Sequence, residues 1–308
     1  MRLARVRLPS GEAPAVELDG HWARIDALLP SLRTVNDALA SRPALADAAA
    51  AADAAELLAG GNAVPLDRAV LGPPLDRPGK ILAIGLNYLD HIKEVGARIP
   101  SAPVLFGKFP SSITGPYDDV VVDERLTTQA DYEVELAVVI GYAARDVPVA
   151  EGFGAVGGYT VANDVSSRDN QHRESQWIRS KSFDGFCPLG PWITTSDEVP
   201  NPHELTLGTT VNGEERQWSS TSQLLFGVDE LVAFLSQGTT LEPGDLILTG
   251  TPPGVAYGMP GQPWLVPGDV VRCEIEGLGH LENRVVGVAG ETASPGFRWG
   301  AADSRAGR

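Results

Sequence analysis

The sequence predicts a β-rich α+β fold in which a small α/β domain precedes a larger domain made mostly of strands. After Lys80, short apolar or alternating segments of strand length outnumber segments with helical periodicity. Before that point the chain is alanine-rich, and residues 65–80 contain four prolines and two glycines, which favours a linker or a rim loop. We therefore predict a boundary near residue 75, with residues 1–75 as the small domain and residues 76–292 as the larger one.

The two ends of the chain are predicted separately. Residues 2–18 indicate a short hairpin with its turn at Pro9-Ser10-Gly11. The alanine-rich residues 33–59 favour helix, which Gly60-Gly61 would end. Residues 293–308 are polar and rich in Gly, Ala and Arg, which is typical of a flexible tail.

The larger part contains strand signals in regular succession. Strand composition and length are found at Ile81–Gly85, Val120–Val122, Val134–Ile140, Tyr159–Asn163, Trp192–Thr194, Leu205–Val211, Asp245–Thr249 and Val270–Ile275. Helix is predicted over residues 87–96, 167–171 and 228–237, and the last of these has apolar residues at helical spacing.

Composition excludes several classes of protein. The 308 residues are 43% hydrophobic and 21% charged, as in an ordinary globular protein. No membrane span is predicted, because no run of about 18 apolar residues occurs, and no signal peptide, because the start lacks an apolar core. The two cysteines, Cys187 and Cys273, fit a reducing cytoplasm. A net charge of −16 argues against nucleic acid or anionic membranes as partners, so an anionic substrate would need a metal ion or a placed Lys or Arg.

Glu133 and Glu135 are the first candidate site residues. They are one residue apart in a predicted strand, so both side chains would point to the same face. A hard divalent cation such as Mg²⁺ would relieve their repulsion, because it takes oxygen ligands. Considered alone, the pair fits a solvated strand face better. Asp164 follows an apolar strand, where it could add a third oxygen ligand or cap a helix.

His91 and Glu94 are neighbours on one face of a predicted helix, because they are three residues apart. A carboxylate beside an imidazole fixes its tautomer and raises its basicity, as a general base requires. An ordinary surface ion pair would use the same spacing. Lys181 lies in an aromatic stretch punctuated by Gly and Pro, where it could meet an anion or simply be a surface lysine. The turn at Thr251 suits an anion or a tight structural loop.

Taken together, these segments resemble the fumarylacetoacetate hydrolase superfamily, over residues 80 to about 290. In chain order the motifs are G-x-N-Y-x-x-H-x-x-E, F-x-K-x-P-S, E-x-E, N-D-x-S-x-R-D, K-x-x-D-x-x-x-x-x-G-P, P-G-D-L-I-L-T-G-T-P-x-G-V and P-G-D-x-V-x-x-x-I-E-G-L-G. Each motif is weak alone, and the ordered set is specific.

The resemblance implies a mixed β-roll preceded by a small N-terminal domain, and a homodimer. It implies Mg²⁺ or Mn²⁺ bound by Glu133, Glu135 and Asp164, and a water-activating dyad, His91 and Glu94, on a mobile lid. Further roles follow for Lys181, which would stabilise an enolate, and for three residues near the substrate, namely Arg168, Gln171 and Thr251.

The activity implied is hydrolysis of a C–C bond in a 2,4-dioxo acid of the acylpyruvate or fumarylpyruvate type, giving pyruvate or a related 2-oxo acid and a carboxylic acid. The alternatives are decarboxylation of oxaloacetate, isomerisation or hydration of a dienoic 2-oxo acid on the same metal site, and a scaffold protein without activity. The sequence departs from the family pattern at Gly254-Val255-Ala256, in residues 257–267, and at Tyr117 and Asp119. These loops are expected to face the distal part of the substrate.

Overall fold

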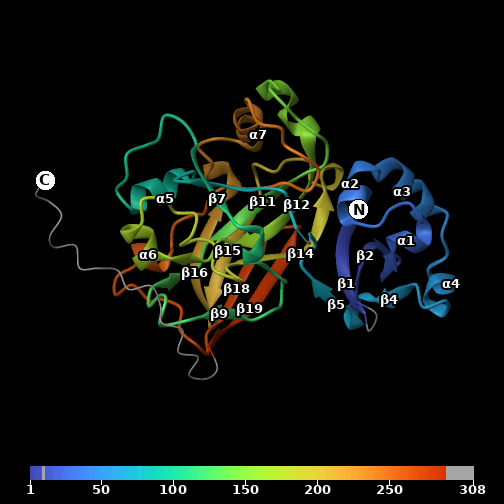
Figure 1. The fold of residues 1–308 in the computed structure, drawn as a ribbon, viewed down its shortest axis with the longest axis horizontal. Coiled ribbons are helices and arrows are strands. Elements are labelled where there is room, and N and C mark those ends of the chain that lie inside the picture. Colours follow the sequence, from blue (N-terminus) through green and yellow to red (C-terminus); the bar gives the residue numbers. More distant parts are fainter. Residues whose placement is uncertain (9–10, 76, 289–308) are drawn as a thin grey trace, which may run out of the picture.

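The computed structural model describes residues 1–8, 11–75 and 77–288, and it confirms the β-rich fold class (Figure 1). Within these residues the strands form sheets of twelve, five and two strands. The predicted tail, residues 293–308, and two residues of the predicted turn, Pro9 and Ser10, lie outside the described residues.

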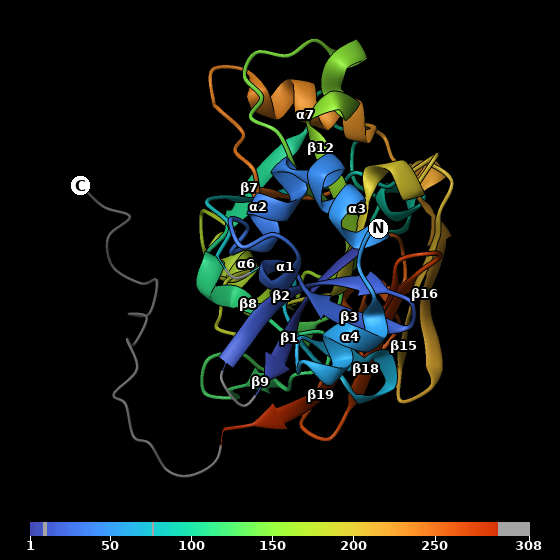
Figure 2. The same ribbon diagram turned by 90° about the vertical axis from the view of Figure 1, so that its right-hand side faces the viewer.

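The first 72 residues contain two small layers, a sheet and a set of short helices (Figures 1 and 2). Their elements are β1 Arg2–Leu8, β2 Gly11–Leu18, β3 His21–Arg24, α1 Ile25–Leu28, α2 Val35–Ala40, α3 Arg42–Ala50, α4 Ala54–Ala59, β4 Ala63–Pro65 and β5 Val70–Gly72. β1 and β2 form the predicted hairpin.

The alanine-rich stretch differs from its prediction, because it folds as three helices rather than one. Thr34 begins α2 with a capping box completed by Asp37, and a proline follows the first residue of α3. Asp53 begins α4 by accepting hydrogen bonds from two backbone N–H groups. These capping residues interrupt a sequence whose alanines alone favour continuous helix.

The rest of the chain alternates strands with a few short helices. The elements are β6 Ile81–Gly85, α5 Leu89–Glu94, β7 Val104–Lys108, β8 Ile113–Thr114, β9 Val120–Val122, β10 Ala130–Asp131, β11 Val134–Ile140, β12 Val156–Asn163, β13 Ser166–Ser167, α6 Arg168–Arg173, β14 Cys187–Thr195, β15 Thr206–Val211, β16 Glu214–Ser220, α7 Val228–Ser236, β17 Leu246–Leu248, β18 Val270–Ile275 and β19 Gly279–Gly287. Even α7, with nine residues, is short, and no helix in the described part of the chain has the length and apolar content to cross a membrane.

One mixed sheet joins the two predicted domains. Its main path runs β4-β3-β2-β1-β14-β12-β11-β17-β6-β7, with β5 beside β1 and β8 beside β14. The junction is the antiparallel pairing of β1 with β14, in which Leu3 lies opposite Ile193. The boundary near residue 75 stays a prediction, and the two parts that it would separate share this sheet.

β11 is the central strand of the fold. All seven of its residues are buried, because the strand has a hydrophobic cluster on each face. Val134, Leu136 and Val138 pack in a cluster that includes residues of the five-stranded sheet β16-β15-β18-β19-β9, whereas Ala137 and Val139 pack in the other cluster. A strand buried on both faces explains the continuous apolar run after Glu135.

Candidate active site

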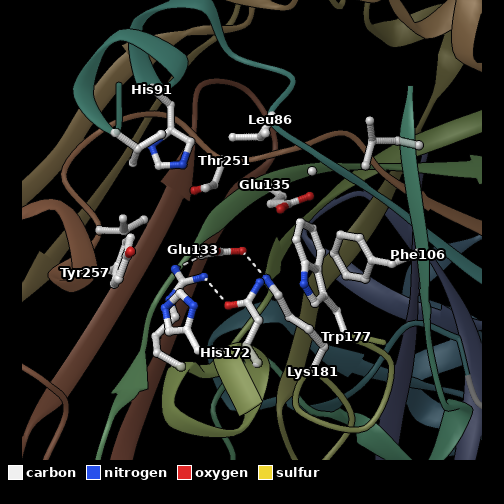
Figure 3. A pocket seen from close by; sticks show the side chains of 16 residues that line it. Leu86, His91, Phe106, Glu133, Glu135, His172, Trp177, Lys181, Thr251 and Tyr257 are labelled. Atoms are coloured by element: carbon white, nitrogen blue, oxygen red, sulfur yellow. Dashed lines mark hydrogen bonds and ion pairs between the residues drawn. The ribbon is translucent and has the colours of Figure 1, made fainter. Parts of the chain in front are cut away.

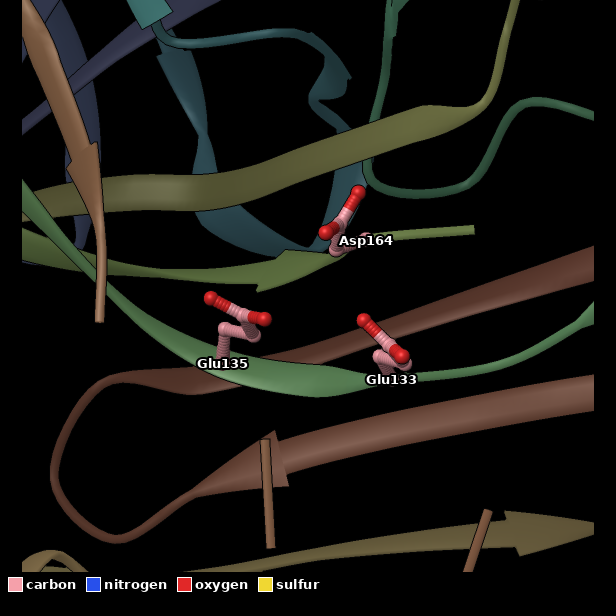
Figure 4. A group of neighbouring side chains, drawn as sticks. All are labelled: Glu133, Glu135 and Asp164. Carbon is pink, nitrogen blue, oxygen red and sulfur yellow. The ribbon is translucent and has the colours of Figure 1, made fainter. Parts of the chain in front are cut away.

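Three carboxylates gather where β11 and β12 lie side by side (Figure 4). Glu133 immediately precedes β11, Glu135 belongs to it, and Asp164 follows the last residue of β12. Each offers a ligand oxygen, and these oxygens all lie within 4.8 Å of one another. The side chains are almost inaccessible, with residue exposures of 5%, 2% and 0%. This burial excludes the solvated strand face that a pair of glutamates alone would suggest.

Two buried lysines lie against this carboxylate cluster. Lys181 Nζ is 2.6 Å from a Glu133 oxygen and 2.8 Å from an Asp164 oxygen. The second Asp164 oxygen is 2.6 Å from Nζ of Lys108. Lys181 is only 2% exposed, so it is not an ordinary surface lysine.

Lys108 is a site residue that sequence reasoning missed. It lies within the F-x-K-x-P-S motif, yet no role was predicted for it. Its ammonium group also donates to the carbonyl oxygens of Phe186 and Lys181. The available signal was a lysine at the end of an apolar strand, but its partner Asp164 is 56 positions away in the chain.

Arg168 holds Glu133 from the other side. Its Nη2 atom is 2.5 Å from Glu133 Oε1, its Nε donates to Asp131 at 2.8 Å, and its Nη1 donates to Gln171 at 3.0 Å. Arg168 and Gln171 both line the cavity described below. These contacts use three of the five guanidinium N–H groups, so Arg168 orients Glu133 and keeps one N–H on Nη1 and one on Nη2 for a ligand.

The charges of the cluster are unevenly balanced. Burial opposes ionisation of Glu133, but Lys181 and Arg168 outweigh it and lower its pKa to about 2. Burial and the charges of Asp164 and Glu133 instead raise the pKa of Glu135 well above its usual value. Glu135 accepts a hydrogen bond from the Gly250 N–H at 2.7 Å, and no ion pair reaches it among the described residues. A cation beside Glu135 would therefore relieve this repulsion.

The donor set fits a hard divalent cation. All three candidate ligands are carboxylates, which are the oxygen ligands such ions prefer. The hydrogen-bonding partners of Glu133 and Asp164 fix the direction of their oxygens, as residues around metal ligands commonly do. The buried acidic triad can thus hold a divalent metal ion.

The His91–Glu94 dyad lies on α5, above the carboxylate cluster (Figure 3). His91 Nδ1 is 2.9 Å from Glu94 Oε2, and the other Glu94 oxygen accepts a hydrogen bond from the Gly254 N–H at 2.8 Å. At the other end of the helix, Asp90 accepts hydrogen bonds from the His91 N–H and the Ser219 hydroxyl. Because Nδ1 of His91 contacts Glu94, the other ring nitrogen, Nε2, is the one left for a ligand.

Thr251 lies near His91 and lines the same cavity. Its hydroxyl oxygen accepts a hydrogen bond of 2.8 Å from Nε2 of Gln217, a completely buried residue that sequence reasoning did not select. The hydroxyl hydrogen of Thr251 is therefore left to donate to a ligand.

A cavity of about 200 Å³ brings the two groups together. Figure 3 shows the dyad histidine on one side of it, Lys181 and Glu133 below, and Phe106 with Trp177 on the opposite side. It is lined by Ile84, Gly85, Leu86, His91, Val95, Phe106, Glu133, Glu135, Arg168, Gln171, His172, Trp177, Lys181, Thr251, Val255 and Tyr257. Asp164 and Glu94 are not in its lining and act from behind Lys181 and His91.

The variable loops divide in their placement. Val255 and Tyr257 line the cavity, as expected for a loop that faces the substrate. The expectation is wrong for Tyr117, whose ring lies 5.8 Å from that of His280 on β19 and outside the cavity lining. Residues 115–118 contact β19 through Asn283, whose amide donates to the Asp118 carbonyl oxygen at 2.8 Å. This attachment to β19 explains why these residues are not part of the cavity lining.

Comparisons with known proteins show the family of this chain. Residues 80–286 match the family model described as fumarylacetoacetate (FAA) hydrolase C-terminal. The chain is 42% identical over 293 residues to the mitochondrial oxaloacetate tautomerase FAHD2A of Homo sapiens, covering 93% of this chain and 92% of that protein.

Solved structures of similar sequence share the fold of this chain. The 5-carboxymethyl-2-hydroxymuconate delta-isomerase of Mycobacterium smegmatis has a TM-score of 0.74 and 36% identity, covering 94% of this chain and 100% of that one. The maleylpyruvate hydrolase of Sphingobium sp. SYK-6, in complex with manganese(II) and pyruvate, has a TM-score of 0.75 and 31% identity, covering 93% and 99%.

Proposed function

This chain belongs to the fumarylacetoacetate hydrolase family of enzymes, and on that premise we propose that it interconverts the enol and keto forms of a small 2-oxo dicarboxylic acid such as oxaloacetate, with Mg²⁺ or Mn²⁺ as cofactor. One observation carries the proposal: an oriented imidazole and a buried ammonium group line the same small cavity as two of three clustered carboxylates. This arrangement suits proton transfer next to a 2-oxo group.

The size of the cavity supports a small substrate. Drug-sized ligands occupy pockets of roughly 300–1,000 Å³, whereas this cavity measures about 200 Å³. The sequence similarity to an oxaloacetate tautomerase supports a four-carbon acid of the same kind.

The side chains have separate tasks in this mechanism. Tautomerisation removes the proton of the enol oxygen and adds one to the neighbouring carbon, so no atom is gained or lost. His91, held by Glu94 through Nδ1, would carry the proton at Nε2. Lys181 uses two donors on Glu133 and Asp164, so its third N–H would be directed to the enolate oxygen.

The metal ion has one task. A divalent cation held by Glu133, Glu135 and Asp164 would supply a Lewis acid that offsets the negative charge of the 2-oxo acid and its enolate.

Hydrolysis of a 2,4-dioxo acid is the second candidate, and the dyad favours it. The same His91–Glu94 pair would take a proton from water, and the hydroxide would attack the distal carbonyl. The likeness to a maleylpyruvate hydrolase supports this reaction. Decarboxylation of oxaloacetate would also pass through an enolate, without attacking water.

One set of assays separates the three reactions. Oxaloacetate in D₂O, followed by proton NMR, reports exchange at the carbon beside the 2-oxo group, and released pyruvate reports decarboxylation. Acetylpyruvate and fumarylpyruvate report hydrolysis as pyruvate plus a carboxylic acid. We expect exchange that is fast with Mg²⁺ or Mn²⁺ and slow with EDTA. Exchange at the uncatalysed rate under both conditions would refute the tautomerase.

Two further predictions concern the setting of the enzyme. We propose a homodimer, as the family resemblance implies, which light scattering of the purified protein would test. We keep the cytoplasm as the proposed location, and fractionation of the producing cells would test it.

A further inference from the structure

Asp131 is a buried carboxylate for which the proposed mechanism gives no role. It is completely inaccessible, and it does not line the cavity. One oxygen accepts hydrogen bonds from the backbone N–H groups of Tyr132 at 2.9 Å and Ala256 at 2.7 Å. The other oxygen accepts from Arg168 Nε at 2.8 Å and from the Tyr257 N–H at 3.1 Å.

These contacts join two segments that are far apart in the chain. On one side, Arg168 holds the candidate metal ligand Glu133 at 2.5 Å. On the other, Ala256 and Tyr257 continue the loop whose Gly254 N–H donates to the dyad residue Glu94.

The same loop surrounds Glu94 closely. The Tyr132 hydroxyl donates to the Gly254 carbonyl oxygen at 3.1 Å. A methyl group added at Gly258 would lie 2.8 Å from the carboxyl carbon of Glu94. A shift of residues 254–258 would therefore move Glu94, and with it the imidazole of His91.

We propose that Asp131 is a positioning residue. By fixing residues 254–258 to Arg168, it holds the dyad in place relative to the metal-binding carboxylates. The inference rests on the proposed function for its catalytic consequence. The link itself is structural and runs from Glu133 through Arg168, Asp131 and the loop to Glu94. A carboxylate is required because four N–H donors converge on it, and an amide has only one accepting oxygen.

The first test compares Asp131→Asn with a matched control. The control is Asp245→Asn, because Asp245 is also a buried carboxylate that accepts from two backbone N–H groups and pairs with a lysine, Lys80, away from the cavity. We expect Asp131→Asn to lower kcat by roughly 10- to 100-fold with little change in KM, as changes behind metal ligands commonly do. Asp245→Asn should leave kcat close to that of the wild type.

A second variant guards against loss of folding. Ala256→Pro removes one N–H donor to Asp131 and leaves the Arg168 contact in place. Ala256 is the first residue of a helical turn and Val255 before it is extended, a setting that accepts proline. This variant should lower kcat in the same direction as Asp131→Asn.

A double-mutant cycle identifies the route of the effect. If Asp131 acts through Glu94, then adding Asp131→Asn to Glu94→Gln should change kcat by no more than about a factor of two. If the two losses multiply instead, Asp131 does not position the dyad and the proposal fails.

Hydrogen–deuterium exchange supplies a readout that needs no activity. In Asp131→Asn, exchange should rise both in residues 250–258 and in residues 88–96, whereas Asp245→Asn should leave both segments unchanged. A rise confined to residues 129–133, or equal changes in both variants, would overturn the proposal. A wild-type protein inactive on every substrate would refute the proposed function, and the exchange data would still decide the coupling.

Discussion

The carboxylate cluster and the dyad helix face each other across one cavity, but they are held by different forces. Glu133 and Asp164 lie in the interior of a sheet, each paired with buried cations at 2.5 to 2.8 Å. α5 is a six-residue helix, which is held to its surroundings by hydrogen bonds from the Gly254 N–H to Glu94 and from the Ser219 hydroxyl to Asp90.

The difference indicates how rate and stability are divided in this site. Breaking a buried ion pair leaves a charge without a partner in a medium of low dielectric constant, so it costs folding free energy. Altering the dyad costs less of this kind, because neither residue is paired with a buried lysine or arginine: His91 contacts Glu94, and Glu94 also accepts from the Gly254 N–H. We therefore expect changes in the helix to affect mainly the rate, and changes in the cluster to affect both rate and stability.

The largest expected effect is on the rate, and it comes from the helix. His91→Ala should lower the turnover of the active substrate by roughly 10²- to 10⁴-fold, because the proton carrier is lost. Thermal unfolding with and without Mn²⁺ should remain as in the wild type. His21→Ala is the control, because His21 lies in the N-terminal sheet, outside the cavity lining, and its ring bonds to the Asp19 carbonyl oxygen. An unchanged rate in His91→Ala would break the comparison.

The next effect is on stability, and it comes from the cluster. Lys108→Met removes one cation from Asp164 and leaves buried acceptors without a donor, so the free energy of unfolding should fall by about 3–5 kcal/mol. Urea unfolding in EDTA measures it. The control is Lys80→Met, whose side chain is 27% exposed and paired with Asp245. Equal losses in the two variants would show that burial does not decide the cost.

Metal binding should reverse the effect of Glu135 on stability, from destabilising without the ion to stabilising with it. In the wild type, Mn²⁺ at 100 times its Kd should stabilise the fold by about 2.7 kcal/mol. Glu135→Gln should lose most of this gain, yet be more stable than the wild type in EDTA, because the repulsion by Glu133 and Asp164 is removed. Melting curves with and without Mn²⁺ test both points. Glu242→Gln, at an exposed position, serves as control, and full stabilisation of Glu135→Gln by Mn²⁺ would contradict the ligand assignment.

The smallest effect concerns a partly exposed pair outside the site, which sharpens the contrast with Lys108. Arg7 on β1 contacts both oxygens of Asp118 at 2.6 and 2.7 Å, and its hydrogen bond lowers the pKa of that carboxyl. Because the folded pKa lies below the unfolded one, the pair stabilises at neutral pH and loses its contribution as the pH falls through the folded pKa. Asp118→Asn should cost at most about 1 kcal/mol at neutral pH.

The measurement for this pair is urea unfolding of Asp118→Asn and the wild type at neutral pH and at about pH 3. The difference between the two proteins should shrink as the pH is lowered. A difference that grows on acidification would reverse the sign of the linkage.

The strands with apolar or β-branched runs were predicted well from the sequence, because such runs need no distant partner to be recognised. Ile81–Gly85, Val120–Val122, Val134–Ile140 and Val270–Ile275 begin and end as predicted. Among the strands after residue 80, the missed ones are β7, β8, β10, β13, β16 and β19. In β19 the buried positions include Asn283, whose side chain donates to carbonyl oxygens of residues 115, 116 and 118, so the polar residue hides the alternation.

The candidate site shows a similar division. Residues within one motif could be related by spacing alone, as with Glu133 and Glu135 on β11 or His91 and Glu94 on α5. Contacts across the fold could not, because they depend on the sheet order. Lys108, Gln217 and Asp131 each reach the site through partners far away in the chain.

The place of β17 in the sheet has a consequence for how the protein is made. This late strand pairs with β11 on one side and with β6 on the other, so it joins the strand of the carboxylates to the strand that leads into the dyad helix. Until Leu246–Leu248 have left the ribosome, the edges of β11 and β6 that pair with β17 remain unpaired. Unpaired strand edges promote association with other chains. We expect nascent chains shorter than this point to need chaperones, and the two halves of the site to meet only near the end of translation.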